Sequence, residues 1–255
     1  MANLTYITEE GMREVIQTEA ARAKAEGKSY IENSTGFGNH LTGTKKKARD
    51  IGETVLSKNP GLGYCLDLNV VEAAGGVHDI GKFQCTDAYH EIEGAYMVMT
   101  RGEEWGLVRG GTQAERRQAL IRIASCLPGD AALVEELGDD FPRTAAYPEF
   151  ATEQIVREYE FLLKELGLSK TAFPQPFTLE AKIACFADFT DATGDTTAVR
   201  ERIQGLYDTY PQRAQEARQQ GDSKKANMIL HRIELIKIAE PRILESCRVV
   251  EQLLK

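Results

Sequence analysis

Hydrophobic residues recur along most of the chain at the spacing of an α-helix. In the segment that follows Thr152 and Glu153, the apolar positions fall 4, 7, 8 and 11 residues after the first one, which places them on one helical face. Gly167 comes next, and glycine is a typical residue to end a helix. The pattern predicts a helix between Thr152 and Gly167 whose inner face is formed by Ile155, Tyr159, Leu162, Leu163 and Leu166.

Three further stretches have the same helical pattern. Thr8, with two acidic residues in the first turn after it, predicts a helix with Met12, Val15 and Ile16 on its inner face. The stretch 178–191 repeats the pattern through Leu179, Ile183 and Phe186. After Asp195 the chain is expected to stay helical and charge-rich to its end, with breaks near Tyr210-Pro211, Gly221-Asp222 and Pro241.

Glycine and proline mark the connections between these segments. They predict loops at 34–38, 59–63, 102–111 and 138–148. Alternation of the strand type hardly occurs, and no Asn-Gly or Asp-Gly hairpin turn is present. The expected fold class is therefore all-α, in a single domain over 1–255 whose core is flanked by helices at 1–30 and 220–255.

Composition narrows the class of protein. With 42% hydrophobic and 27% charged residues, the 255-residue chain has the make-up of a globular domain and excludes a disordered or collagen-like protein. Its net charge of −8 argues against a binder of duplex nucleic acid, which needs a basic surface. A few cations or a metal ion within one cleft could still attract a small anion.

The sequence also suggests a cellular location. No export signal is visible at the N-terminus, and no stretch approaches the roughly 18 apolar residues of a membrane span. The five cysteines are scattered and never form a Cys-x-x-Cys pair, which favours thiols in a reducing cytoplasm over disulfides or a zinc-thiolate site. We therefore expect a cytoplasmic protein without a membrane partner.

The adjacent pair His78-Asp79 is the first candidate for chemistry. Neighbouring residues on a helix point about 100° apart, so both can reach one ion only near a helix end or a bend. The small residues 73–76 and Gly81 fit such a close approach and such an end. Imidazole and carboxylate together suit Zn²⁺, Mn²⁺, Fe²⁺ or Ni²⁺ better than Ca²⁺.

Further metal ligands are available elsewhere in the chain. His40 is expected to begin a helix whose inner face continues through Thr44, Ala48, Ile51 and Val55. Asp188 lies at the border of an apolar stripe, with Ala184 and Ala181 one and two turns before it. A carboxylate buried there without a partner would be costly, so a metal ion or another cation is its natural partner.

In this order, His40, His78-Asp79 and Asp188 resemble the HD-domain superfamily of metal-dependent phosphohydrolases. The local match is closest to the HDIG branch, because residues 78–82 read His-Asp-Ile-Gly-Lys. Residues 90–95, His-Glu-Ile-Glu-Gly-Ala, look like a later helix of the family with the pattern His-x-x-x-Gly-Ala. Residues 179–203 are similar to the segment in which the final Asp precedes a helix with an Arg. The resemblance covers roughly 36–210 and implies an HD-like helical bundle.

The resemblance also implies roles for individual residues. His40, His78, Asp79 and Asp188 would bind a divalent metal ion, which lowers the pKa of a bound water and polarises a phosphoryl oxygen. Asp79 would also orient that water. Lys82 would contact the substrate phosphate, with Arg202 as a second candidate for that contact. His90 would protonate the leaving oxygen or bind a second ion.

One feature departs from the two-metal members of the superfamily, many of which supply additional histidines after the position of His90. The sequence has no histidine between Glu91 and Asp188. We therefore expect one ion per chain (Mn, Fe, Ni, Co, Zn or Mg), with any second ion held loosely by carboxylates such as Glu91 or Glu93.

The expected function is hydrolysis of a phosphate ester, with a nucleotide or a related small metabolite as substrate. The alternative is a degenerate HD domain that binds a nucleotide or a partner protein without turnover. An oxygenase on the related diiron scaffold would need more histidines than the chain has. Self-association stays open, because the C-terminal helix carries apolar residues that could pack on its own domain or on a second subunit: Ile229, Ile233, Ile236 and Leu244.

Overall fold

The computed structural model describes residues 4–28, 34–84, 90–127, 153–165, 178–190 and 196–255. Within these ranges the chain is almost entirely helical, so the predicted all-α fold is confirmed. In chain order the elements are β1 (Thr5–Tyr6), α1 (Glu9–Ala25), α2 (Ser34–Lys58), the 3₁₀ helix η1 (Pro60–Tyr64), α3 (Leu68–Val77), the 3₁₀ helix η2 (Ile80–Phe83), α4 (His90–Arg101), β2 (Val108–Arg109), α5 (Gln113–Ala124), α7 (Glu153–Glu165), α8 (Leu179–Phe189), α9 (Thr196–Gln219) and α10 (Ser223–Leu253).

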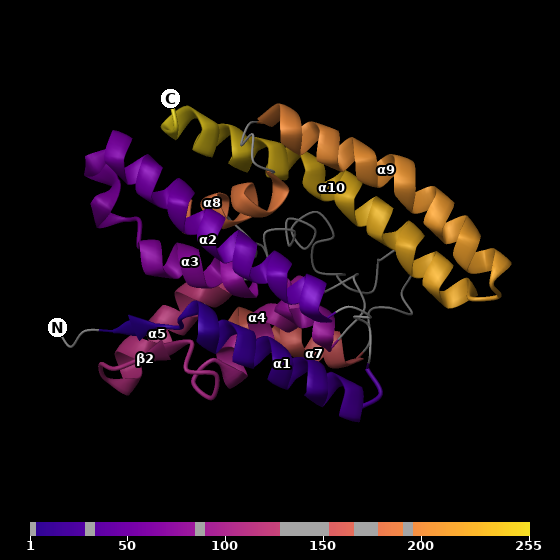
Figure 1. Ribbon diagram of the computed structural model, residues 1–255, viewed down its shortest axis with the longest axis horizontal. Helices are drawn as coiled ribbons and strands as arrows, with labels where there is room; N and C mark the ends of the chain where they lie inside the picture. Colours follow the sequence, from indigo (N-terminus) through magenta and orange to yellow (C-terminus); the bar gives the residue numbers. More distant parts are fainter. Residues whose placement is uncertain (1–3, 29–33, 85–89, 128–152, 166–177, 191–195) are drawn as a thin grey trace.

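The helices lie in three tiers (Figure 1). α9 and α10 form a long antiparallel hairpin along one side of the molecule. α2, α3 and α8 lie next to it, and α8 contacts α10 as well as α2 and α3. On the opposite side α4 packs against α5 and α7, and α1 packs against α2. α8 thus joins the C-terminal hairpin to the rest of the bundle, together with a smaller contact between α10 and α2.

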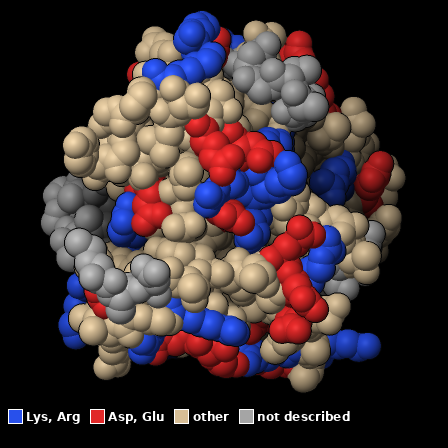
Figure 2. Space-filling model, turned by 60° about the vertical axis from the view of Figure 1, so that its left-hand side comes forward, with Lys and Arg blue, Asp and Glu red and all other residues tan. Residues whose placement is uncertain are grey.

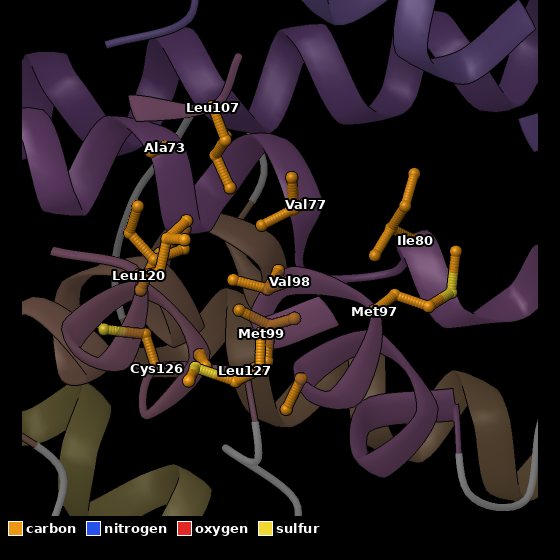
Figure 3. Packing of buried hydrophobic residues seen from close by; sticks show 14 of the residues in the cluster. Ala73, Val77, Ile80, Met97, Val98, Met99, Leu107, Leu120, Cys126 and Leu127 are labelled. Atoms are coloured by element: carbon orange, nitrogen blue, oxygen red, sulfur yellow. The ribbon is translucent and has the colours of Figure 1, made fainter. Parts of the chain in front are cut away.

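Two clusters of buried apolar side chains fill the spaces between these tiers. The first cluster, part of which is shown in Figure 3, gathers side chains around α3, α4 and α5. The second cluster joins α2, α8, α9 and α10. α8 contributes to both, with Ala181 and Ala184 in the first cluster and Phe186 and Ala187 in the second. The small alanines let neighbouring helices approach α8 closely near Asp188.

Polar side chains fix the starts of several helices. Thr8 caps α1 by accepting a hydrogen bond from the Gly11 amide at 3.1 Å, and Thr178 caps α8 through the Ala181 amide at 3.3 Å. Both helix starts were predicted from the sequence. The predicted break at 221–222 is also confirmed, because Gly221 has a φ of +81° and Asp222 caps α10.

Some predictions about helix boundaries were wrong. Residues 34–38 form the start of α2 rather than a loop, so His40 lies inside this helix and does not begin it. The two glycines in this turn are tolerated because tertiary contacts outweigh their low helix propensity. The ring of Phe37 packs edge-on against Phe83, and a Cβ at Gly38 would already touch Ile16 at 3.4 Å.

The breaks predicted at the two prolines do not occur either. Pro211 lies inside α9 and Pro241 lies inside α10. A proline removes one backbone donor from a helix, and that loss is offset here by packing along the hairpin. The packed side chains near the two prolines include Ala214, Ala217, Ala226, Ile243 and Leu244.

The outcomes of the remaining predictions differ from one segment of the chain to the next. Residues 59–63 fall largely within η1, while 102–111 is irregular apart from β2, which pairs with β1 in an antiparallel register. Tyr159, Leu162 and Leu163 are buried on α7 as predicted. The segment 138–148 lies outside the described residues, as do Leu166 and Gly167.

The surface carries charges of both signs. Figure 2 shows lysine and arginine side chains intermingled with acidic ones on the displayed face, so the net charge of −8 does not form one continuous acidic patch there. Among the described helices, none has the length and apolar character needed to cross a membrane.

Gly81 allows η2 and α4 to pack in direct backbone contact. A Cβ at this position would overlap the carbonyl oxygen of His90 and lie 2.6 Å from the amide nitrogen of Gly94. We predict that Gly81→Ala lowers the free energy of unfolding by at least about 2 kcal/mol, because backbone atoms have to move. Urea denaturation measures this change.

The matched control is Gly205→Ala in the middle of α9, where the described residues place no atom within 4 Å of the added Cβ apart from the neighbouring backbone of the helix itself. This variant should be stabilised by about 0.5–1 kcal/mol through helix propensity alone. Equal unfolding energies for Gly81→Ala and the wild type would show that the close contact does not constrain the fold.

Candidate metal centre

The end of α3 places His78 and Asp79 side by side. α3 ends at Val77, His78 is its C-terminal cap, and Asp79 has φ −104° and ψ 7°, after which η2 begins. The backbone thus leaves α-helical geometry between the two residues. This is the helix-end placement that the sequence predicted for the pair, and it allows both side chains to face the same region.

Gly75 brings α3 against α2 and so brings His78 close to His40. A Cβ at Gly75 would lie 2.9 Å from the Ala48 Cβ and 3.0 Å from the Thr44 carbonyl oxygen. The Nδ1 atom of His78 lies 2.9 Å from the carbonyl oxygen of Gly75. Because that carbonyl can only accept, Nδ1 carries the proton and Nε2 is left to face the cluster.

Three side chains from distant parts of the chain meet at this point. The Nε2 atoms of His40 and His78 lie 3.0 Å apart. The Oδ1 atom of Asp188, at the end of α8, is 3.5 Å from Nε2 of His40 and 3.4 Å from Nε2 of His78. These ligand atoms lie close enough together to hold a metal ion. The sequence predicted this convergence.

Asp79 lies at the edge of the same cluster. Its Oδ2 atom is 3.6 Å from Nε2 of both His40 and His78, and it accepts a hydrogen bond from Lys82 at 2.7 Å. Its Oδ1 atom is 2.8 Å from Nε2 of His90, which is buried at the start of α4. Asp79 therefore connects the cluster to the cation at Lys82 and to the imidazole at His90.

Charge interactions shift the pKa values of the clustered groups. Desolvation alone would lower the pKa of His78, but the carboxylates of Asp79 and Asp188 raise it to about 9. Burial would raise the pKa of Asp188, but His78 and Arg202 hold it below its usual range. The pKa of Asp79 is also lowered, since Lys82 and the histidines outweigh the effect of burial. Both carboxylates thus stay ionised and can interact with a cation.

Arg202 and Lys47 line the outer side of the cluster. Arg202 donates to the backbone carbonyl of Asp188, lies 3.4 Å from its carboxylate and stacks over the ring of Phe189 at 5.2 Å. Lys47 donates to the backbone carbonyl of Thr190. A cavity of about 430 Å³ opens here, bounded by these residues and His40.

A second cavity, of about 130 Å³, lies on the inner side of the cluster, toward α9 and α10. Two of its lining residues, Glu91 and Arg232, form a pair with Nη1 of Arg232 3.0 Å from Oε1 of Glu91. Sequence reasoning did not identify Arg232 as part of the site. A signal was present, because Arg232 falls on the inner face defined by Ile229, Ile233 and Ile236.

Glu93, named from the sequence as a loose ligand for a second ion, is engaged elsewhere. It lies beside Glu158 of α7, and Gln154 donates to both carboxylates, at 3.3 Å to Glu93 and 2.8 Å to Glu158. Burial, followed by the hydrogen bond and repulsion from Glu158, raises the pKa of Glu93 to about 9. Glu93 thus belongs to the contact between α4 and α7.

Comparison of the chain with models of protein families, with curated proteins and with solved structures gives no match. Function is therefore inferred from the side chains of the site.

The buried pair of Glu93 and Glu158 predicts that stability falls with rising pH. The folded protein keeps a proton on Glu93 up to a pKa of about 9, whereas the unfolded chain releases it near the ordinary value of 4.5. Between these values the folded state binds more protons, so the free energy of unfolding decreases by as much as about 1.4 kcal/mol per pH unit for one proton.

Urea denaturation at pH 6 and pH 8 of the wild type and of Glu93→Gln measures this contribution. The amide mimics the protonated acid, so the variant should lose less stability than the wild type over this interval. Identical pH dependence of the two proteins would contradict the assignment.

Proposed function

We propose that the protein is a metal-dependent phosphohydrolase of the HD superfamily that hydrolyses a phosphate ester of a nucleotide or a related small metabolite. The observation that carries this proposal is the meeting of His40, His78 and Asp188, from α2, the end of α3 and α8, with Asp79 at their edge. This is the ligand set that the resemblance implies for the family.

The chemistry of the donor set supports a divalent ion of the transition series. Two imidazole nitrogens and carboxylate oxygens suit Mn²⁺, Fe²⁺, Co²⁺, Ni²⁺ or Zn²⁺. The hydrogen bond between His78 and the Gly75 carbonyl fixes the tautomer that leaves Nε2 as a ligand. Among the described residues, His40, His78 and Asp188 offer three ligands within reach of one ion, which agrees with one ion per chain.

Side chains of the protein would orient the water, accept its proton and bind the phosphoryl oxygens. The chemistry that the ion supplies when bound is activation of water and polarisation of a phosphoryl oxygen. Asp79 would orient the attacking water and accept its proton. His90 is buried and touches Oδ1 of Asp79, so its geometry favours a role in positioning that carboxylate over direct protonation of a leaving oxygen. Lys82 and Arg202 would bind phosphoryl oxygens.

The charges around the inner cavity favour an anionic substrate. Three cationic side chains (Lys82, Arg202, Arg232) and three carboxylates (Asp79, Glu91, Asp188) line it. A histidine that binds a metal ion is neutral, because the ion displaces the proton. The side-chain charges then cancel, so a divalent ion would leave the cavity with two net positive charges. A phosphate ester would be attracted there in spite of the overall negative charge of the protein.

Substitution of a ligand should abolish tight metal binding. We predict that Asp188→Asn weakens Mn²⁺ binding to the metal-free protein by at least tenfold, because a neutral amide replaces a charged ligand. Isothermal titration calorimetry measures this affinity. The matched control is Asp208→Asn, which removes an exposed carboxylate that accepts a hydrogen bond from Gln204 at 2.9 Å within α9. Equal Mn²⁺ affinity of the wild type and Asp188→Asn would refute the metal centre.

Turnover tests the hydrolase itself. Hydrolysis of p-nitrophenyl phosphate in Mn²⁺, Ni²⁺ or Co²⁺ should fall on the order of 10²–10⁴-fold in Asp79→Ala, since the residue proposed to accept the proton is lost. The Asp208→Asn variant should keep the wild-type rate. A wild-type protein that binds metal and nucleotides but hydrolyses no phosphorylated compound would instead be the degenerate binding domain.

A further inference from the structure

The C-terminal hairpin forms one wall of the inner cavity. The opposite wall is made by side chains of the candidate metal site and their neighbours, including His78, Asp79 and Asp188. The hairpin contributes two cations, Arg202 from α9 and Arg232 from α10, and the phenol of Tyr210. The rest of its contribution is apolar and consists of Leu206, Ile236 and Ile243. The cavity therefore has a charged side and a hydrophobic side.

Arg232 is held on the charged side through a chain of contacts. Its side chain is 13% exposed and lies 3.0 Å from Glu91, whose side chain is 8% exposed. Oε1 of Glu91 is 3.1 Å from Nε2 of His90, and this nitrogen is 2.8 Å from Oδ1 of Asp79. Arg232 is thus linked to the metal cluster through two side chains, although it lies 141 residues away from Glu91 in the sequence.

The burial of Arg232 calls for an explanation. Desolvation of an arginine is costly, and a buried ion pair is often no more stabilising than apolar packing. The guanidinium at a cavity wall also offers planar donors that match phosphoryl or carboxylate oxygens. Arg232 lies beyond residues 36–210, the part of the chain that resembles the HD superfamily. The resemblance to the HD superfamily therefore does not account for Arg232 at the cavity wall.

We propose that Arg232 and the apolar face of the hairpin select the ligand of this site. The ligand is an organic anion whose charged group contacts Arg232 beside the metal cluster and whose apolar group packs on Leu206, Ile236 and Ile243. The inner cavity has a volume of about 130 Å³, which limits the ligand to a small molecule. This inference rests on the proposed function, since it assigns the selective part of the same site.

Two phosphonates that cannot be hydrolysed provide the test. Phenylphosphonate and methylphosphonate share the anionic group and differ in the apolar one. Calorimetric titration of the full chain with Mn²⁺ should give roughly tenfold tighter binding of phenylphosphonate. Arg232→Gln should weaken binding of both compounds roughly 10–100-fold, whereas Ile236→Ala should weaken binding of phenylphosphonate alone.

Two control variants separate ligand binding from folding. Arg248→Gln changes an exposed arginine on the same helix that pairs with Glu245, and it should bind both compounds as the wild type does. The double variant Glu91→Gln, Arg232→Gln removes the pair without leaving a buried charge unbalanced. It should fold, as judged by circular dichroism, and still bind both phosphonates weakly.

The inference is overturned if the wild type binds neither phosphonate, if it binds both equally, or if the double variant regains wild-type affinity. Hydrolysis of p-nitrophenyl phosphate that persists while Arg232→Gln binds normally would sink this inference and leave the proposed function intact. Binding of phenylphosphonate that depends on Arg232, without metal binding or hydrolysis by the wild type, would instead support the inference and refute the phosphohydrolase.

Discussion

The balance of charge around Asp79 and Asp188 is the constraint on which the rest of the site depends. Two carboxylates withdrawn from water are unstable unless positive charge lies close to them. In the structure that charge comes from Lys82 on Asp79, from Arg202 on Asp188 and from the imidazole of His78, whose pKa the two carboxylates raise. The same arrangement of nitrogen and oxygen atoms fits a divalent cation. A stable fold and a metal site therefore both require positive charge beside these carboxylates.

Close backbone packing makes this arrangement of charges possible. Gly75 lets α3 approach α2, and Gly81 lets η2 contact the first turn of α4. The first contact sets the distance between the two histidines, and the second sets the position of His90 beside Asp79. Glycine is needed at both positions because a side chain would collide with the neighbouring element. An unusual backbone angle is not the reason, since neither residue has a positive φ. The glycine positions are therefore as much a part of the site as its charged residues.

The C-terminal hairpin bounds the inner cavity on one side. α10 packs against α8, the helix that carries Asp188, and α10 also supplies Arg232 to the inner cavity. The hairpin thus contacts the cluster from the side opposite to α2 and α3. Residues close to the cluster thus balance its charges, whereas we assign ligand selection to the hairpin.

The sequence by itself determined the helical class, the starts of α1 and α8 and the set of residues that meet at the candidate site. Helical periodicity and capping are local, and metal-ligating side chains in a recognisable order carry their own chemistry, so both can be read without coordinates. Only the tertiary structure decided that α2 begins at Ser34, that the helices continue through Pro211 and Pro241, and that Glu93 turns toward α7. It also decided that Arg232 reaches the cavity. Each of these depends on contacts between residues far apart in the chain, and the free energy of such contacts exceeds the local preferences that the sequence displays.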